Sequence, residues 1–445
     1  MRVLARLGLD RRELRAWAAY DWANSAFITV VVSAVFPIFF VKVAGADLAE
    51  TEASRRFTIA TTIALALSAV LAPVLGAIAD RAPVKKRFLL AFSALGVLAT
   101  LAMTTIDRGD WLWALVLFGV ANLGANGAFV FYDALLPHVA RPHEVDRVST
   151  AGYALGYLGG GLLLAALGAT GLGSIGLVHL AFAVTAVWWA AFAIPLFRHV
   201  PEPALPPERR ARGLAALRAA FTDLRATYRE LRRFPQAALM LVAFLIYNDG
   251  IGTIYRIAVV YGAELGLATS SLITALVVVQ FVGIPATFAF GALAGRIGTR
   301  AAILLGLAVY AGVSVYGYYM TTATDFFVLA VMVGLVQGGT QALSRSLFAS
   351  MIPRHRSSEF FGLFAVFEKF AGIAGPAIFA GAQTLFGSSR PAILSIIVFF
   401  AVGALLLTRV DVAAGRATAA AANEAAGGAA SPAANGVGSA EGDPA

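Results

Sequence analysis

Ionisable side chains lie inside long apolar stretches of this sequence. Asp249 is the deepest carboxylate and has Arg256 seven residues further on, and Glu368 and Lys369 stand side by side in a later stretch. A charge in hydrocarbon costs several kcal/mol, so such residues usually bind a solute, carry a proton or form a buried ion pair. We predict that Asp249 or Glu368 binds an ammonium group or a coupling proton, and that Arg256 or Lys369 binds a carboxylate. A static pair between Asp249 and Arg256 is the alternative.

Amide side chains form two stripes at helical spacing. Asn122, Asn126 and Asp133 recur at intervals of four and seven residues, which places them on one face of a helix. Gln337 and Gln341 repeat the pattern in a later stretch. The residues predicted to bind the solute are Asn122, Asn126, Tyr157, Asn248, Asp249, Arg256, Gln337 and Gln341. Hydrogen bonding between helices is the alternative for the asparagines.

Three charged residues lie nearer to the ends of their stretches. Asp133 is predicted as a gate group, and Asp21 either takes part in coupling or forms a charge pair at a helix end. Arg345 either binds a substrate carboxylate or pairs permanently with Asp133 or Asp21, and its depth favours the permanent pair. Trp17 is expected in the aromatic belt at the membrane interface.

Composition defines the elements that must hold these residues. Of the 445 residues, 59% are apolar and 13% are charged, whereas soluble domains are about 25% charged. The chain is therefore predicted to be an all-α membrane protein. The net charge of +9 comes from arginines and lysines between apolar runs, which argues against nucleic acid as a partner. Without cysteine or paired intramembrane histidines, neither a metal, a cofactor nor an enzymatic site is expected.

Twelve apolar runs are long enough to cross a bilayer as helices. They cover residues 17–43, 57–79, 88–106, 111–137, 148–169, 175–197, 236–262, 270–294, 301–320, 325–350, 360–386 and 391–408. Most lysines and arginines fall on one side of this pattern, so both termini are predicted to be cytoplasmic. The expected segments are a cytoplasmic N-terminal segment 1–16, six-helix bundles 17–197 and 236–408, a linker 198–235 with an amphipathic helix, and a disordered tail 409–445.

The two halves repeat at an offset of 215 residues. Gly76-Ala-Ile-Ala-Asp80-Arg81 after the second run aligns with Gly291-Ala-Leu-Ala-Gly295-Arg296 after the eighth. The stripe of Asn122 and Asn126 aligns with that of Gln337 and Gln341 at the same offset. Many transporters bind their solute between such repeats, so the chain is predicted to form two pseudo-symmetric bundles around a central site.

The loop after the second run resembles the signature of the major facilitator superfamily. Gly76, Asp80, Arg81, Lys85 and Lys86 match it, whereas Pro83 stands where the family usually has glycine. The resemblance implies the major facilitator fold. Asp80 and Arg81, with the basic cluster, are predicted to form a charge latch that breaks and reforms as the halves rock.

Further segments resemble the vacuolar effluxer-like permeases of fungi and their bacterial relatives, a branch of that superfamily. The matching segments are Ala16–Phe27, Tyr247–Gly250, Gln341–Phe348 and Glu359–Gly362, within a resemblance that spans about 15 to 408. The resemblance implies secondary transport, with amino-acid export as the best-known activity of the fungal branch.

The sequence thus predicts a secondary transporter that moves a small polar solute, an amino acid or similar zwitterion, by alternating access. Efflux is the favoured direction, with proton coupling as an option. A lipid or amphiphile carrier and a transporter-like sensor are the alternatives. The abundance of arginine and alanine over lysine indicates a GC-rich bacterial source and a plasma membrane location. Expected partners are the solute, membrane lipids and protons, and the protein is expected to be monomeric.

Overall fold

The computed structural model describes residues 7–48, 50–80, 84–168, 175–204, 231–265, 267, 269–370 and 389–428. All regular structure within these ranges is helical. The first half contains α2 (Arg12–Ala26), η1 (Phe27–Val35), α3 (Phe36–Phe39), η2 (Phe40–Ala44), α4 (Glu50–Ala79), α5 (Lys85–Ala102), η3 (Met103–Thr105), α6 (Trp111–Val139), α7 (Val145–Gly168) and α8 (Ile175–His199). The second half contains α10 (Pro235–Glu264), α11 (Thr269–Ile297), α12 (Thr299–Tyr319), α13 (Ala323–Ser350), η5 (Arg354–Arg356), α14 (Ser357–Phe370), α16 (Ser389–Ser395), α17 (Ile397–Thr408) and α18 (Val412–Gly428).

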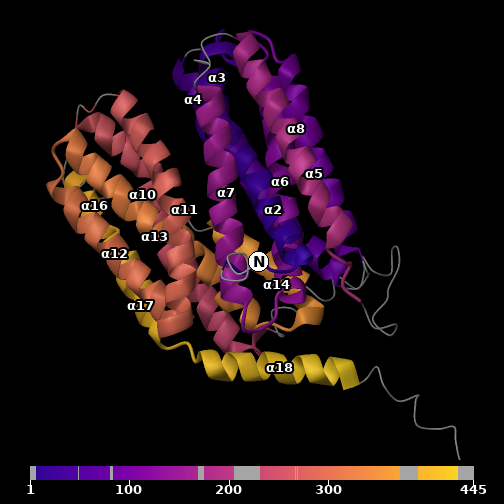
Figure 1. The fold of residues 1–445 in the computed structure, drawn as a ribbon. Coiled ribbons are helices and arrows are strands. Elements are labelled where there is room, and N and C mark those ends of the chain that lie inside the picture. Colours follow the sequence, from indigo (N-terminus) through magenta and orange to yellow (C-terminus); the bar gives the residue numbers. More distant parts are fainter. Residues whose placement is uncertain are drawn as a thin grey trace, which may run out of the picture.

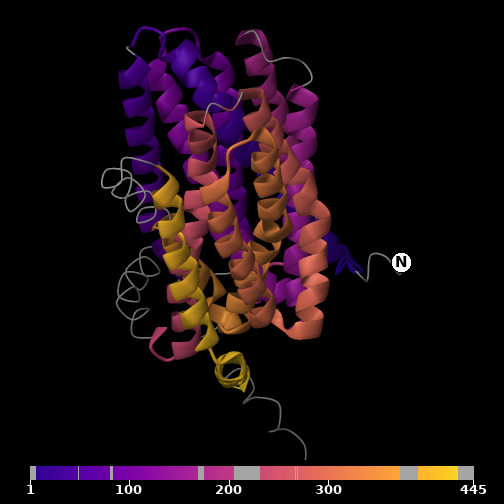
Figure 2. The same ribbon diagram turned by 90° about the vertical axis from the view of Figure 1, so that its left-hand side faces the viewer.

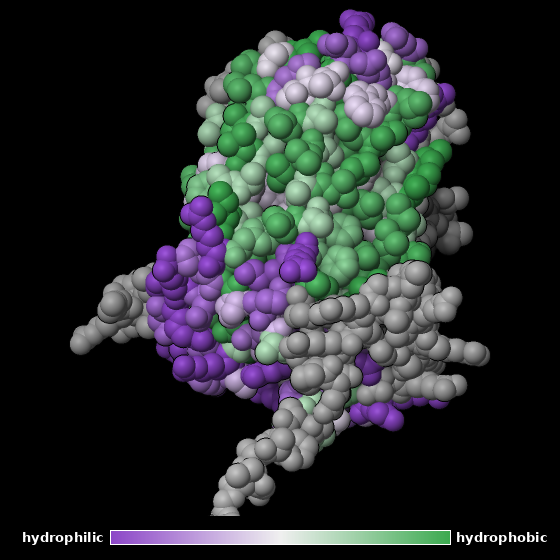
Figure 3. Space-filling view, turned by 90° about the vertical axis from the view of Figure 1, so that its right-hand side faces the viewer, coloured by the Kyte–Doolittle hydropathy of each residue, from purple (hydrophilic) through white to green (hydrophobic). Residues whose placement is uncertain are grey.

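Nine helices in the described ranges are long and apolar enough to cross a membrane, or ten if one bent pair at the C-terminal end counts as a span. The other two predicted runs correspond to α4 and α14, and α14 is described only as far as Phe370. Large apolar side chains such as Ile63, Val70 and Leu98 are exposed on the flanks. Figure 3 shows the resulting hydrophobic belt between two hydrophilic ends. The protein is a multi-pass membrane protein, and the total of twelve spans stays a prediction.

Local sequence signals set where the helices begin. Thr322 accepts a hydrogen bond from the Asp325 amide at 3.2 Å, and the Asp325 carboxylate accepts one from the Thr322 amide at 2.9 Å. This reciprocal cap satisfies amides that the first turn of α13 leaves without a helical partner. Gly298, at φ 89°, makes the tight turn between α11 and α12, a conformation that favours glycine. These caps fix the register in which each helix presents its polar residues.

The helices form two groups that follow the two halves of the chain (Figures 1 and 2). The groups meet near α14 and diverge toward the end where α3 and α16 lie (Figure 1). Across the interface α4 packs on α14, and α7 packs on α11 and α13. We call the end near α14 the basic end, because Lys86, Arg87, Arg141, Arg300 and Arg354 lie there.

Two glycines related by the sequence repeat lie at close contacts between the halves. A Cβ atom on Gly76 of α4 would lie 2.3 Å from the Ser358 carbonyl oxygen of α14. A Cβ atom on Gly291 of α11 would lie 2.4 Å from the Thr150 hydroxyl of α7. Glycine lets helix backbones approach this closely. The repeat therefore places equivalent small residues at the two crossings between the halves.

The C-terminal segment differs from the prediction. Disorder was expected throughout 409–445, and this is wrong for Val412–Gly428, which form α18. Alanine is the best helix former, so an alanine-rich segment becomes helical once it has a surface to pack on. Here Asn423 accepts a hydrogen bond from the Arg354 amide at 2.8 Å, and Gly415 packs on Met351. The predicted amphipathic helix of the linker falls mostly on residues 205–230, outside the described residues.

Candidate functional site

A cavity of about 340 Å³ lies between the two halves. It opens among helices that are far apart in sequence, because α2, η1, α6 and α7 contribute from one half and α10, α11, α13 and α14 from the other. The polar residues that line it are Asp21, Ser25, Thr29, Ser33, Asn126, Asp133, Tyr153, Tyr157, Tyr255, Gln280, Gln337, Gln341, Arg345 and Glu368. A polar cavity at the interface of two bundles suits a small polar solute.

Arg345 of α13 lies buried at one edge of this cavity and ties the halves together. Its Nη1 donates to Asp133 Oδ1 at 2.9 Å, and both terminal nitrogens donate to Asp21 Oδ2 at 3.5 and 3.4 Å. Its Nε donates to the Ser149 hydroxyl and its Nη2 to the Ser149 carbonyl oxygen, each at 3.0 Å. A guanidinium has five N–H donors, so these contacts leave none for a substrate carboxylate. In this structure Arg345 thus pairs with both carboxylates at once.

Aromatic rings enclose the same guanidinium. Its central carbon lies 4.4 Å from the ring centre of Tyr153 and 5.0 Å from that of Trp17. Tyr132 stacks on Trp17 and donates its hydroxyl to Asp21 Oδ2 at 2.8 Å. Trp17 is fully buried within the protein, so its ring does not face the lipid as the rings of an interfacial aromatic belt do. These rings strengthen the charge contacts, because they exclude water and offer their π faces to the cation.

The predicted amide stripes separate into residues that line the cavity and residues that do not. Asn126, Gln337 and Gln341 line it, as does Tyr157. Asn122 is absent from the lining and donates to the Phe118 carbonyl oxygen of its own helix at 2.8 Å. This bond lies within α6, so it is neither the predicted contact with the cavity nor the alternative bond between helices.

Gln341 also connects the cavity to α10. Its Nε2 donates to Asn248 Oδ1 at 2.6 Å, so Asn248 lies directly behind the lining. The neighbouring residue Asp249 is 4% exposed and does not line the cavity. On the next residue, Gly250, a Cβ atom would meet Phe399 and Phe400 of α17. Asn248 thus supports the cavity wall, while α10 packs against α17 two residues further on, at Gly250.

Glu368 of α14 lines the cavity on the side of the second half. Lys369 and Arg256 belong to α14 and α10, but their side chains lie outside the described part of the structure. Arg81 also lies outside the described residues. The predicted roles of these residues stay predictions.

Several contributors to the site were not among the predicted residues, including Ser25, Thr29, Ser33 and Tyr255 of the lining. Gln280 of α11 also lines the cavity, and Ser149 of α7 contacts Arg345. The sequence could have indicated Gln280, because this polar residue lies near the middle of the apolar run 270–294. The sequence gives no such indication for Ser149, because its partner depends on how α7 and α13 pack.

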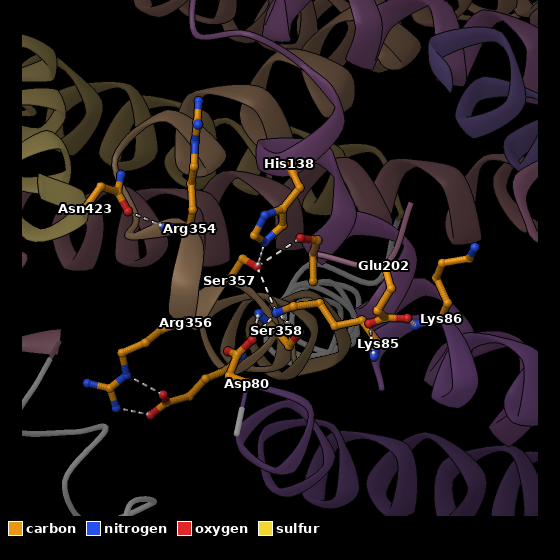
Figure 4. Close-up of polar contacts among 12 residues, drawn as sticks. Asp80, Lys85, Lys86, His138, Glu202, Arg354, Arg356, Ser357, Ser358 and Asn423 are labelled. Carbon is orange, nitrogen blue, oxygen red and sulfur yellow. Dashed lines mark hydrogen bonds and ion pairs between the residues drawn. The ribbon is translucent and has the colours of Figure 1, made fainter. Parts of the chain in front are cut away.

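A second polar cluster closes the basic end (Figure 4). The Asp80 carboxylate pairs with Lys85 and accepts hydrogen bonds from the amides of Ser358 at 3.2 Å and Glu359 at 2.7 Å. These amides belong to the first turn of α14, whose partial positive charge favours a carboxylate. Lys85 also donates to the Ser358 hydroxyl at 2.7 Å. Asp80 and Lys85 come from the first half and α14 from the second, so this cluster joins the halves.

Glu202 supports this cluster from the segment that follows α8. Its two carboxylate oxygens accept hydrogen bonds from the amides of Lys85 at 2.7 Å and Lys86 at 3.0 Å (Figure 4). These amides open α5, so Glu202 satisfies two donors that the first turn of this helix leaves without a helical partner.

The helical bundle with its central polar cavity and closing contacts defines a transporter of the major facilitator type. Solved structures of such transporters share the fold. The human organic anion transporter MFSD10 (TETRAN) aligns with a TM-score of 0.72 at 14% identity, over 89% of this chain and 99% of its own. The proton:xylose symporter XylE aligns with a TM-score of 0.68 at 11% identity, over 90% of this chain and 95% of its own.

The family model described as "Vacuole effluxer Atg22 like" matches residues 50–420, and the chain belongs to this family. The MFS-type transporter YxiO of Bacillus subtilis (strain 168), itself uncharacterized, is 36% identical over 89% of this chain and 94% of its own length. Autophagy-related protein 22-1 of Phaeosphaeria nodorum is 24% identical over 92% of both chains. Family and fold together identify a membrane transporter, not an enzyme.

Proposed function

We propose that this transporter exports an amino acid or a similar zwitterion across the plasma membrane by alternating access, coupled to protons. In this proposal the basic end and both termini face the cytoplasm, in keeping with the excess of lysine and arginine there. The structure then corresponds to a state that is closed on the cytoplasmic side. The protein acts as a monomer, because each half already finds its partner within the chain.

The contact between Arg345 and its two carboxylates carries the proposal. One guanidinium of the second half faces Asp21 and Asp133 of the first, so the buried cluster holds one more negative than positive charge. A proton or a substrate ammonium group that reaches Asp133 removes this surplus and weakens the hold on Arg345. Breaking a buried ion pair costs about 3–5 kcal/mol, so such compensation is what allows the halves to separate at this end.

The cavity favours a solute that carries N–H donors. Gln280 Oε1 and Gln337 Oε1 are buried in its wall and have no hydrogen-bond partner in the described part of the chain. An unpaired buried acceptor costs about 1–3 kcal/mol, and an N–H donor on the solute would satisfy such an oxygen. Because Arg345 has no donor left, the carboxylate of a zwitterion needs another cation, for which Arg256 and Lys369 are the candidates.

A matched ligand screen tests the proposal. Thermal shifts of the purified protein in detergent would be measured with L-amino acids, the corresponding amines, the corresponding carboxylic acids, sugars and lysolipids. Amino acids are expected to raise the melting temperature most, amines less, and the acids and sugars not at all. Uptake of the active ligand into proteoliposomes, with and without a proton gradient, then tests coupling. A shift with carboxylic acids but not with amines would overturn the assignment of the cavity.

A lipid or amphiphile carrier is the competing function. The charged cluster and the amides of the cavity disfavour it, because an acyl chain would leave them without partners. A response to lysolipids alone would make it the leading account.

A further inference from the structure

A groove of about 730 Å³ lies at the basic end, on the side of α12 and α17. Its walls include the start of α12, the end of α17 and the start of α18 from the second half, with His143 and Asp146 from the first. Figure 2 shows α17 and α18 meeting at this end of the molecule. The groove is separate from the solute cavity and shares no lining residue with it.

Three arginines give the groove its charge. Arg300, Arg409 and Arg416 line it, and within the described ranges no carboxylate forms an ion pair with any of them. The two carboxylates that also line it are already engaged. Asp146 accepts hydrogen bonds from the hydroxyls of Thr299 and Ser346, and Asp411 accepts one from the Ala414 amide. The groove therefore holds three guanidinium groups against two carboxylates, and no carboxylate in the described ranges is paired with any of the three.

The backbone holds one of these guanidinium groups in place. Arg300 Nη1 donates to the carbonyl oxygens of Val410 at 2.7 Å and Thr408 at 3.3 Å, which fixes it beside the end of α17. A guanidinium group that is fixed in this way, with two more in the same groove, suits the oxygens of a phosphate.

We propose that this groove binds the phosphate headgroup of an anionic phospholipid. The groove lies where α12 begins and α17 ends, which is the level at which lipid headgroups surround a spanning helix. Because both halves contribute walls, a bound headgroup bridges them and stabilises the state that is closed at the basic end. This inference is independent of the solute that the central cavity carries.

The test compares melting temperatures of the full-length protein in detergent with added phosphatidylglycerol or phosphatidylcholine. Phosphatidylglycerol is expected to raise the melting temperature by several degrees more than phosphatidylcholine. Arg409→Gln/Arg416→Gln should lose most of the difference, with phosphatidylglycerol binding about fivefold weaker per arginine removed in native mass spectrometry. Arg409→Lys/Arg416→Lys keeps the charges and should keep most of the response. Arg12→Gln, an exposed arginine on α2, is the matched control and should respond like the native chain.

Two results would overturn the inference. One is an unchanged phosphatidylglycerol response in Arg409→Gln/Arg416→Gln. The other is a shift of the same size with glycerol phosphate or inorganic phosphate in place of the lipid, which would assign the groove to a soluble anion. Because Arg409 and Arg416 are exposed, the lipid-free melting temperature of the double variant should match that of the native chain.

Discussion

Arg345 Nη1 lies 2.9 Å from Asp133 Oδ1, although the two residues belong to opposite halves of the chain. The Arg345 side chain is 2% exposed, and Asp133 lines the central cavity. The same ion pair therefore lines the solute cavity and holds the two halves together at the basic end. Alternating access requires that these two properties be linked, because the halves must separate here only when the cavity is correctly loaded.

Removing the guanidinium should destabilise the protein strongly. Arg345→Ala leaves Asp21 and Asp133 buried without their cation, a loss of about 3–5 kcal/mol that should lower the melting temperature by several degrees. Adding Asp21→Asn to Arg345→Ala should restore part of the lost stability, because one uncompensated buried charge is then removed. A double variant that melts below the single variant would show that charge burial is not the cause.

Neutralising Asp133 should separate binding from coupling. Asp133→Asn keeps the side-chain volume and one acceptor for Arg345, so the fold should persist. We expect ligand binding by thermal shift to weaken about tenfold and proton-driven uptake to disappear, because the surplus charge is lost. Asp249→Asn, which does not line the cavity, is the matched comparison. Equal losses in both variants would contradict the assignment of the coupling role to Asp133.

Weakening the latch should shift the protein toward the state open at the basic end. Asp80→Asn removes the charge that pairs with Lys85 and faces the first turn of α14. The chain has no cysteine, so Asn126→Cys can report access to the cavity with an impermeant thiol reagent. We expect Asp80→Asn to slow labelling from the end opposite the basic end several-fold. Asp411→Asn removes a charge at the basic end without touching the latch, and it should label at the unaltered rate.

Gly76 and Gly295 belong to the repeated motif in opposite halves of the chain, and they should respond to substitution in opposite ways. Gly76→Ala would place a Cβ atom 2.3 Å from the Ser358 carbonyl oxygen, so α4 and α14 must move apart at a cost of about 1–3 kcal/mol. Gly295→Ala meets nothing within 4 Å and should be neutral or stabilise the protein by about 0.4–1 kcal/mol. Melting temperatures of the two variants distinguish these outcomes, and a tolerated Gly76→Ala would mean that the crossing is less tight than described.

The sequence alone determined the class of fold. Apolar runs must become helices in a bilayer, because no other open structure satisfies their backbone hydrogen bonds there. The repeat and the loop around Asp80 then indicated two related halves and a contact that closes them. The pairing of Arg345 with Asp21 or Asp133 followed from the cost of leaving a buried cation alone.

Only the tertiary structure decided which polar residues face the cavity. Periodicity gives the face of a residue on its own helix, but not the neighbour toward which packing turns that face. Asn122 and Asn126 share a stripe, yet the first bonds to its own helix and the second lines the cavity. For the same reason, periodicity could not predict that Gln280 lines the cavity or that Ser149 contacts Arg345. The ordering of α18 likewise depends on Met351 and Arg354, a surface assembled from residues about sixty positions away.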